Sequence, residues 1–286
     1  PQAGARVRTI YIGGGTPTTL TAGQLEHLIS HLRQKLDLSR LVEFTVEAGR
    51  PDTITADKMS VLHDLEVDRV SVNPQSMRDE VLKAMGRSHT AADILKAYDM
   101  VRKSGIPIVN MDLIAGLPRD TVEGFRYTLD EVLKLAPENV TVHTLALKKG
   151  ARLMMERQGL PSGEETSAML DYAWQALRQQ VQIPYYLYRQ KNTLQNLENV
   201  GWCKPGHEGY YNIYIMEEVQ TILSAGAGGS TKLVADGGKR MQRIFNFKYP
   251  TEYIQRFAEV LERKKGVADF YDHDLGPETS GGDRPL

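Results

Sequence analysis

Two acidic side chains stand inside stretches whose other residues are mostly apolar. Glu47 lies near the end of residues 42–48, and Asp112 lies near the end of residues 107–114. A buried carboxylate costs free energy unless something pairs with it, and a ligand that carries hydroxyls or an amine is one such partner. The competing interpretation is a structural ion pair with an arginine, for which the sequence offers Arg50, Arg69 and Arg87.

A run of three glycines, Gly13, Gly14 and Gly15, directly follows the β-branched and aromatic segment 9–12. Glycines present no side chain, so a ligand could lie against their backbone, and a tight turn without a ligand is the alternative. The run is neither of two familiar phosphate loops. No lysine follows it as in a P-loop, and Thr18 stands where the dinucleotide fingerprint needs its third glycine.

Further polar or small residues follow the other strand-like segments. If these segments form a parallel sheet, their carboxyl ends meet at one edge, and the residues there gather around one mouth. Besides the glycines, Glu47 and Asp112, this edge would carry Gln75, Gly116, His143 and Leu145, with Arg87 on a nearby loop. The shared placement favours a ligand site, although a lone histidine such as His143 is more often a satisfied core residue.

The sequence does not indicate several other kinds of site. Its histidines and carboxylates show no recognisable metal spacing, and it has no Gly-x-Ser-x-Gly hydrolase motif. The single cysteine, Cys203, excludes internal disulfides and any metal site made of cysteines alone. Lys148, Lys149 and Arg152 form either a solvated face or a clamp for substrate carboxylates.

Composition excludes further classes of protein. The 286 residues carry a formal net charge of -1, whereas a dedicated nucleic-acid binder usually has a basic excess. No apolar run approaches the roughly 20 residues of a membrane span, and no secretory signal is present. We expect a cytoplasmic protein that uses neither a nucleic acid nor a membrane as its partner.

The first half of the chain alternates strand-like and helical patterns. Thr21, Thr55, Thr90 and Asp120 stand where helix caps are expected. Strands are predicted at 7–12, 42–48, 68–73, 107–114 and 139–145. Helices are predicted at 22–37, 56–65, 78–86, 91–103 and 121–135. This order predicts an α/β fold, an open or partial parallel barrel covered by helices.

The second half is expected to be a smaller α+β region. It begins with a long helix at 164–182, and a turn-rich stretch continues to Asn212. The remaining elements are predicted as a helix at 214–223, a β segment at 243–247 and a helix at 250–265. We therefore predict a barrel domain at 1–160, a C-terminal region at 161–271 that completes the substrate side, and a disordered tail at 272–286.

Taken in order, these motifs resemble the radical S-adenosylmethionine superfamily, and most nearly its oxygen-independent coproporphyrinogen III oxidase (dehydrogenase) branch. The resemblance covers roughly residues 8–265. Its segments are TIYIGGGTPTTL, FTVEAGRPDTIT, DRVSVNPQSM, MGRSHT, MDLIAGLP and NVTVHTLALKKG, followed by NLENVGWCKPGHEGYYN and LSAGAGGSTK.

The resemblance implies an S-adenosylmethionine site at the predicted strand ends. Gly14, Gly15 and Thr16 would hold the amino and carboxylate groups of the cofactor, and Glu47 would also face it. The residues that would contact its ribose and methionine parts are Gln75, Arg87 and Asp112. Those that would line the adenine side are Ile114, Gly116 and Leu145.

The family also binds a 4Fe–4S cluster through a Cys-x3-Cys-x2-Cys loop, which follows the strand before the GGGTP strand. The sequence begins after that point, so we expect five of the family's six barrel strands and no metal ligands in this chain. Cys203 cannot replace three cysteines. Because the cofactor carries the difficult chemistry, we expect this chain to be inactive as given and name no certain catalytic residue in it.

The resemblance implies a parent enzyme of heme biosynthesis. It would abstract hydrogen from two propionates of coproporphyrinogen III, each of which loses carbon dioxide and becomes a vinyl. The cations that could bind the propionates of this porphyrinogen are Lys148, Lys149, Arg152 and Arg189.

Three alternatives stay open. They are a heme- or porphyrin-binding carrier on the same scaffold, a radical enzyme acting on another substrate, and a cofactor-independent lyase that uses Glu47 and Asp112 as acid and base. The uncovered edge of the first strand would expose unpaired backbone groups that can bind another chain. We therefore expect an interface or a packed loop there, and self-association through this edge is possible.

Overall fold

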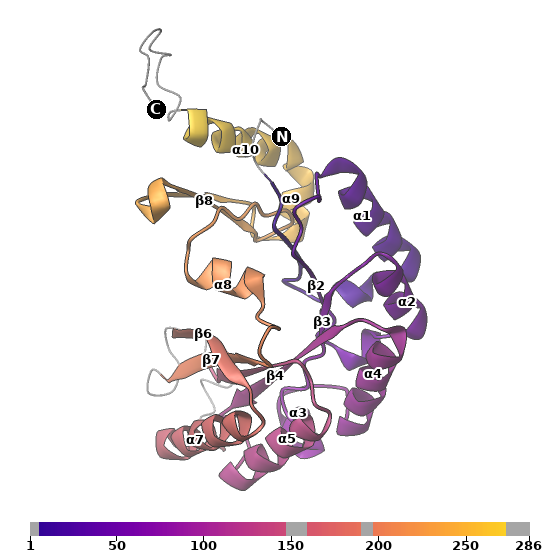
Figure 1. The fold of residues 1–286 in the computed structure, drawn as a ribbon, viewed down its shortest axis with the longest axis vertical. Coiled ribbons are helices and arrows are strands. Elements are labelled where there is room, and N and C mark those ends of the chain that lie inside the picture. Colours follow the sequence, from indigo (N-terminus) through magenta and orange to yellow (C-terminus); the bar gives the residue numbers. More distant parts are fainter. Residues whose placement is uncertain (1–5, 147–158, 190–196, 273–286) are drawn as a thin grey trace, which may run out of the picture. The chain divides into compact units, whose positions relative to one another are not determined.

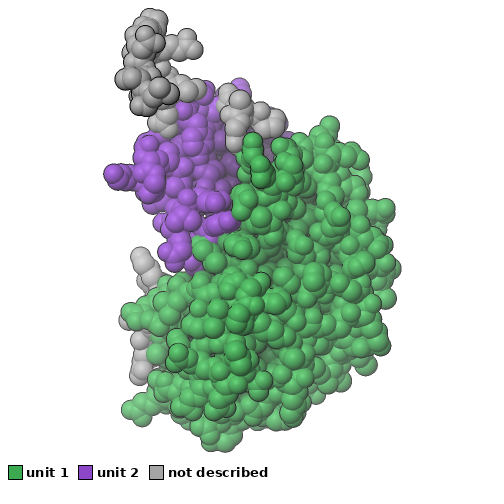
Figure 2. Space-filling view, in the orientation of Figure 1, with its two compact units in different colours: residues 1–213 green, residues 214–286 purple. Residues whose placement is uncertain are grey.

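The computed structural model describes residues 6–146, 159–189 and 197–272. The chain divides into two compact units, Pro1–Ile213 and Tyr214–Leu286 (Figure 2).

The first unit is built on one sheet of seven strands in the order β1-β2-β3-β4-β5-β7-β6 (Figure 1). Its strands are β1 Thr9–Ile12, β2 Glu43–Glu47, β3 Arg69–Ser71, β4 Ile108–Ala115, β5 Asn139–Thr144, β6 Ile183–Arg189 and β7 Glu198–Cys203. Strands β1 to β5 pair in parallel with their sequence neighbours, while β7 runs antiparallel to both β5 and β6. Parallel pairing requires a crossover after each strand, and helices supply it.

Helices cover the outer face of this curved sheet (Figure 1). They are α1 Ala22–Lys35, α2 Ala56–Asp64, α3 Asp79–Ala84, α4 Ala91–Ser104, α5 Val122–Lys134 and α7 Gly163–Gln179. Thr21, Thr90 and Ser162 each begin a helix with a capping box, in which the cap and a side chain three residues later bond each other's backbone N–H.

The pleat of the strands separates an apolar face from a polar one. In β4, Val109, Met111 and Leu113 are fully buried and belong to one core cluster with side chains of α4, α5 and α7. Their neighbours Asn110 and Asp112 therefore face the inner, concave side, because successive residues of a strand point to opposite faces. The other parallel strands repeat this pattern, so the inside of the half-barrel is lined mainly by polar groups.

The second unit is a hairpin packed on a helix. Strands β8 Ser230–Ala235 and β9 Arg240–Phe245 pair antiparallel, and Leu233 and Ile244 form a small buried core with Phe270. The helices here are α9 Pro250–Gln255 and α10 Phe257–Asp272. Helix α8, Tyr210–Met216, crosses from the first unit into the second.

The predicted α/β fold and the five parallel strands are confirmed, but the second half differs from prediction in detail. The stretch to Asn212 that we predicted as turns contains β7, and strand β8 was missed. Because β7 and β6 extend the barrel sheet, contacts divide the chain after Ile213 rather than at residue 160. A functional boundary at 160 stays a prediction, and residues 273–286 of the predicted tail lie outside the described residues.

Two local predictions were wrong for reasons visible in the contacts. Thr121, not Asp120, caps α5, since its hydroxyl accepts from Gly124 N at 3.0 Å while Asp120 pairs with Arg78. The helix expected at 214–223 begins at Tyr210. Its first amide groups donate to the carboxylate of Glu43, a partner distant in the sequence.

Candidate functional site

Glu47 ends β2 beside the glycine run and is held by two groups from β1 and its loop. The Tyr11 hydroxyl donates to one carboxylate oxygen, and Gly14 N donates to the other at 3.1 Å. Burial, and then the charge of Glu47, raise the pKa of Tyr11, which keeps the phenol protonated as a donor. The arrangement needs glycine at position 13, because a Cβ there would lie 2.4 Å from the Tyr11 ring and 2.7 Å from the Glu47 carboxyl carbon.

The backbone at Gly14 and Gly15 is open. No heavy atom outside the adjoining residues lies within 4 Å of the place where a Cβ would stand at either residue, and both are exposed. Gly14 has a φ of +84°, a conformation that side chains other than glycine rarely adopt. Thr16 follows half-buried and leads into the short helix Pro17–Thr19. This loop can therefore present backbone groups directly to a ligand.

Asp112 lies on the inner face of β4 within a chain of polar groups. Asn110 Nδ2 donates to it at 2.7 Å, and His143 Nε2 lies 3.8 Å from its other oxygen. The Tyr188 hydroxyl in turn lies 3.2 Å from His143 Nδ1. Burial raises the pKa of Asp112, but His143 and Asn110 outweigh this effect, so its pKa lies below the usual range and the carboxylate stays charged.

Arginine does not pair with either carboxylate among the described residues. Arg50 binds Asp52 at 2.6 Å, and Arg69 lies 3.5 Å from Glu43. Arg87 lies on the loop that follows α3. Its guanidinium has no hydrogen-bond or ion-pair partner in the described part of the chain. The structural ion pairs that competed with a ligand site are therefore absent from Glu47 and Asp112 in this part of the structure.

Gln75 is fixed next to Asp112 by its backbone. Its N–H donates to the Asp112 carbonyl at 2.9 Å, and its carbonyl accepts from Ile114 N at 3.1 Å. The residue has a φ of +66° and is 8% exposed, yet its side-chain oxygen has no hydrogen-bond partner within the described residues. A buried acceptor without a donor is costly, so this oxygen is suited to receive a donor from a ligand.

The other predicted residues fall into two groups. Ile114 shares the inner face of β4 with Asp112, Gly116 follows that strand with a φ of +84°, and Leu145 N donates to the Ala115 carbonyl at 2.9 Å. These three lie close to Asp112 along the sheet. Lys148, Lys149 and Arg152 lie outside the described residues.

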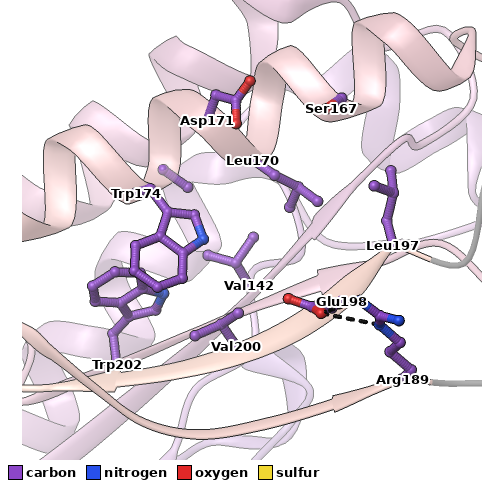
Figure 3. A pocket seen from close by; sticks show the side chains of 11 residues that line it. Val142, Ser167, Leu170, Asp171, Trp174, Arg189, Leu197, Glu198, Val200 and Trp202 are labelled. Atoms are coloured by element: carbon purple, nitrogen blue, oxygen red, sulfur yellow. Dashed lines mark hydrogen bonds and ion pairs between the residues drawn. The ribbon is translucent and has the colours of Figure 1, made fainter.

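Arg189 lies on the opposite side of the sheet from Asp112. It pairs with Glu198 at 2.5 Å and lines a cavity with Val142 and Val200, which point outward from β5 and β7 (Figure 3). The structure therefore places Arg189 away from the inner-face residues. Its role in binding the propionates of the substrate stays a prediction.

Sequence reasoning missed several residues of the inner face. Tyr11 and Asn110 are next-but-one neighbours of Gly13 and Asp112 on their strands, so the two-residue alternation of a strand could have indicated them. Tyr186 lies over Gly201, where a Cβ would stand 1.8 Å from its ring. This contact depends on the register in which β6 pairs with β7. The residues around Tyr186 and Gly201 do not indicate that register.

The amino ends of the strands are closed by the segment that leads into α8. Arg69, the first residue of β3, donates to the carbonyls of His207 and Glu208 at 3.0 and 3.2 Å. Nearer the carboxyl ends, the Tyr211 ring stacks at 4.2 Å on Tyr11, whose hydroxyl binds Glu47. Glu43 accepts from Tyr210 N at 2.8 Å. Within the first unit, a ligand can therefore be expected at the carboxyl ends of the strands, where the open glycine loop lies.

Comparisons with known proteins decide the family. Residues 2–132 match the family model described as the Radical SAM superfamily. The heme chaperone HemW of Lactococcus lactis is 30% identical over 92% of this chain and 67% of its own length. The oxygen-independent coproporphyrinogen-III oxidase-like protein HemZ of Bacillus subtilis is 44% identical over 91% of this chain and 52% of its own length. The chain belongs to the radical SAM superfamily.

The predicted resemblance is thus confirmed, and so is the radical SAM fold. The structure of the Escherichia coli coproporphyrinogen III oxidase HemN superposes with a TM-score of 0.68, covering 89% of this chain and 57% of HemN at 23% identity. The chain spans about half the length of HemZ. No helix in the described part of the chain is long and apolar enough to cross a membrane. The expected cytoplasmic location stays a prediction.

Radical SAM proteins use S-adenosylmethionine and a 4Fe–4S cluster, and the residues here fit the two groups unequally. The described residues contain no group of three or more histidines, cysteines or acids that could hold a metal ion. Cys203 is buried, and burial raises the pKa of its thiol to about 12, which disfavours the thiolate that metals bind. A cluster does not fit these residues. The open glycine backbone, the two carboxylates and the unpartnered Gln75 oxygen do fit a small polar cofactor.

Proposed function

We propose that this chain is the S-adenosylmethionine-binding half-barrel of an oxygen-independent coproporphyrinogen III oxidase-like protein of heme biosynthesis. One observation carries the proposal. Glu47 and Asp112 face one concave surface without arginine partners among the described residues, beside open glycine backbone. The similarity to HemZ supports the choice of branch.

The inner-face residues divide the binding task by their chemistry. The backbone of Gly14, Gly15 and Thr16, together with Glu47, receives the amino-acid end of the cofactor, since a carboxylate and carbonyl groups accept from an ammonium. Asp112 accepts from the ribose hydroxyls, because its low pKa keeps it an acceptor at neutral pH. Gln75 and Arg87 contact the ribose and methionine parts, and Ile114, Gly116 and Leu145 line the adenine.

Bound and reduced by a cluster, the cofactor would supply the radical that abstracts hydrogen from the substrate. In this proposal each of two propionates of coproporphyrinogen III would lose one hydrogen atom to the radical, one molecule of carbon dioxide, and one electron to a one-electron acceptor outside this chain. A vinyl would remain at each position. The cluster ligands lie outside this sequence, because it contains one cysteine. The chain alone therefore binds the cofactor weakly and does not cleave it.

The test uses a longer protein in which this chain follows a strand with a Cys-x3-Cys-x2-Cys loop, reconstituted with iron and sulfide. Under reductant, we expect 5′-deoxyadenosine from S-adenosylmethionine, and a vinyl product from coproporphyrinogen III. Asp112→Asn should weaken cofactor binding about 10-fold, as loss of a hydrogen bond to a charged group implies. Asp99→Asn is the matched control, since Asp99 is exposed and pairs with Lys103 on α4.

Two results would contradict the proposal. A cluster-loaded protein that neither binds nor cleaves S-adenosylmethionine would remove the cofactor site. Equal effects of Asp112→Asn and Asp99→Asn on binding would show that the inner-face carboxylate has no special part in it.

The similarity to HemW favours a second candidate, a heme carrier on the same scaffold. It predicts tight binding of heme, with no decarboxylation, by the cluster-loaded protein. Cleavage of the cofactor without either porphyrin outcome would instead support a radical enzyme with another substrate. Turnover by this chain in the absence of iron would support the cofactor-independent lyase.

A further inference from the structure

A cavity of about 540 Å³ lies on the outer side of the sheet, beneath α7. Its floor includes Val142 of β5 and Val200 of β7, and Trp174 of α7 and Trp202 of β7 lie together at one end (Figure 3). Val142 alternates with Thr141 and His143, which face inward, so the sheet separates this cavity from the proposed cofactor site. The two sites therefore lie on opposite faces of the sheet.

The two tryptophans give the cavity an aromatic wall. Their rings meet edge to face, with centroids 4.6 Å apart at 81°. Trp202 is 1% exposed and Trp174 is 36% exposed, so Trp174 presents ring surface to anything that enters. Neither indole N–H has an acceptor within the described parts of the chain, although indole N–H groups at buried positions usually have one.

The described residues that line the cavity carry a net negative charge. Asp171 of α7 has no ion-pair or hydrogen-bond partner among the residues that the structure describes, while Glu198 and Arg189 neutralise each other at 2.5 Å. The uncompensated charge is therefore a carboxylate one helical turn from Trp174. The described residues that line the cavity include no histidine, cysteine, methionine or tyrosine, so they offer no side chain that usually ligates heme iron.

We propose that this cavity binds a flat aromatic or heteroaromatic cation, with its ring against Trp174 and its charge near Asp171. A cation gains from the tryptophan face and from the carboxylate together, whereas an anion is repelled by the same carboxylate. The apolar floor adds the hydrophobic contribution of a ring removed from water. The site would serve a molecule other than the porphyrinogen, whose propionates are anionic.

The chain itself supplies the reporter for a test, because its two tryptophans both line this cavity. We would titrate the full chain with proflavine, a flat aromatic cation, and follow tryptophan fluorescence and the anisotropy of the dye. 8-Anilinonaphthalene-1-sulfonate is the anionic comparison. We expect saturable quenching by proflavine and binding of the anion at least about 10-fold weaker.

Variants assign the binding to the cavity. Asp171→Asn should weaken proflavine binding about 2- to 5-fold, in line with a partly exposed charge pair. Trp174→Leu should weaken it about 10-fold, and Trp202 remains as reporter. Glu164→Gln, at an exposed position on the same helix outside the cavity, is the matched control and should leave binding unchanged.

The proposal is overturned if proflavine does not quench saturably, or if the anion binds equally well. It is also overturned if Glu164→Gln weakens binding as much as Asp171→Asn. Thermal unfolding of each variant shows whether the fold persists, and Asp171→Asn, at an exposed position on α7, should unfold at the temperature of the unchanged chain.

Discussion

Replacing Glu43 by glutamine removes one charge from a buried ion pair at the amino end of the sheet. Glu43 and Arg69 are 3% and 4% exposed, and their nearest charged atoms lie 3.5 Å apart. Breaking such a pair costs about 3–5 kcal/mol, because the remaining charge stays buried. Arg69 keeps the Asn139 side chain and two backbone carbonyls as partners, so we expect the lower end, about 3 kcal/mol.

Urea unfolding measures this change in the free energy of unfolding. With a slope of about 3 kcal/mol per molar urea, the midpoint of Glu43→Gln should fall by about 1 M. Asp52→Asn is the control, since Asp52 pairs with Arg50 at a more exposed place and should cost below about 1 kcal/mol. Adding Arg69→Met to Glu43→Gln should restore part of the loss. If Glu43→Gln costs no more than the control, the assigned role of this pair in closing the sheet is wrong.

Two further predictions concern packing and pH. Gly201→Ala should destabilise the chain by about 1–3 kcal/mol, because the new Cβ would lie 1.8 Å from the Tyr186 ring. Thermal unfolding measures this loss, and adding Tyr186→Leu should recover stability. If Gly201→Ala alone causes no loss of stability, the contact is refuted. Burial, and then the charge of a neighbouring arginine, lower the pKa of His89 below its ordinary value. The unfolded chain then binds more protons below about pH 6.5, so stability should fall as the pH drops through that value. His89→Gln should flatten this dependence in urea unfolding at successive pH values, whereas the exposed His31→Gln should leave it unchanged.

The two faces of the sheet explain how one scaffold separates stability from binding. Val109, Met111 and Leu113 of β4 and Val140 of β5 point outward and are fully buried in the core cluster beneath the helices. The inward residues are mainly polar, and their hydrogen-bond partners come from their own strand, from neighbouring strands and from α8. Substitutions inside should therefore change ligand affinity more than fold, apart from the Glu43 and Arg69 pair that closes the amino end.

Much of the first half was determined by local sequence. The alternation of residues in 107–114 encodes a strand with Asp112 on one face, and Thr21 and Thr90 encode the starts of their helices. Such signals need only neighbouring residues, because strand and helix periodicities act over a few positions. The glycine run likewise indicated, from its lack of side chains, a loop whose backbone a ligand could approach.

Only the tertiary structure decided how buried polar groups are satisfied. Glu47 is held by Tyr11, which is 36 residues away, and Glu43 by amide groups of α8, which are 167 and 168 residues away. The antiparallel strands β7 and β6 joined the sheet because its β5 edge was free to pair, and this pairing turned Arg189 away from Asp112. Long-range pairing depends on which edges and charges the folded chain leaves unsatisfied, and no short sequence window contains that information.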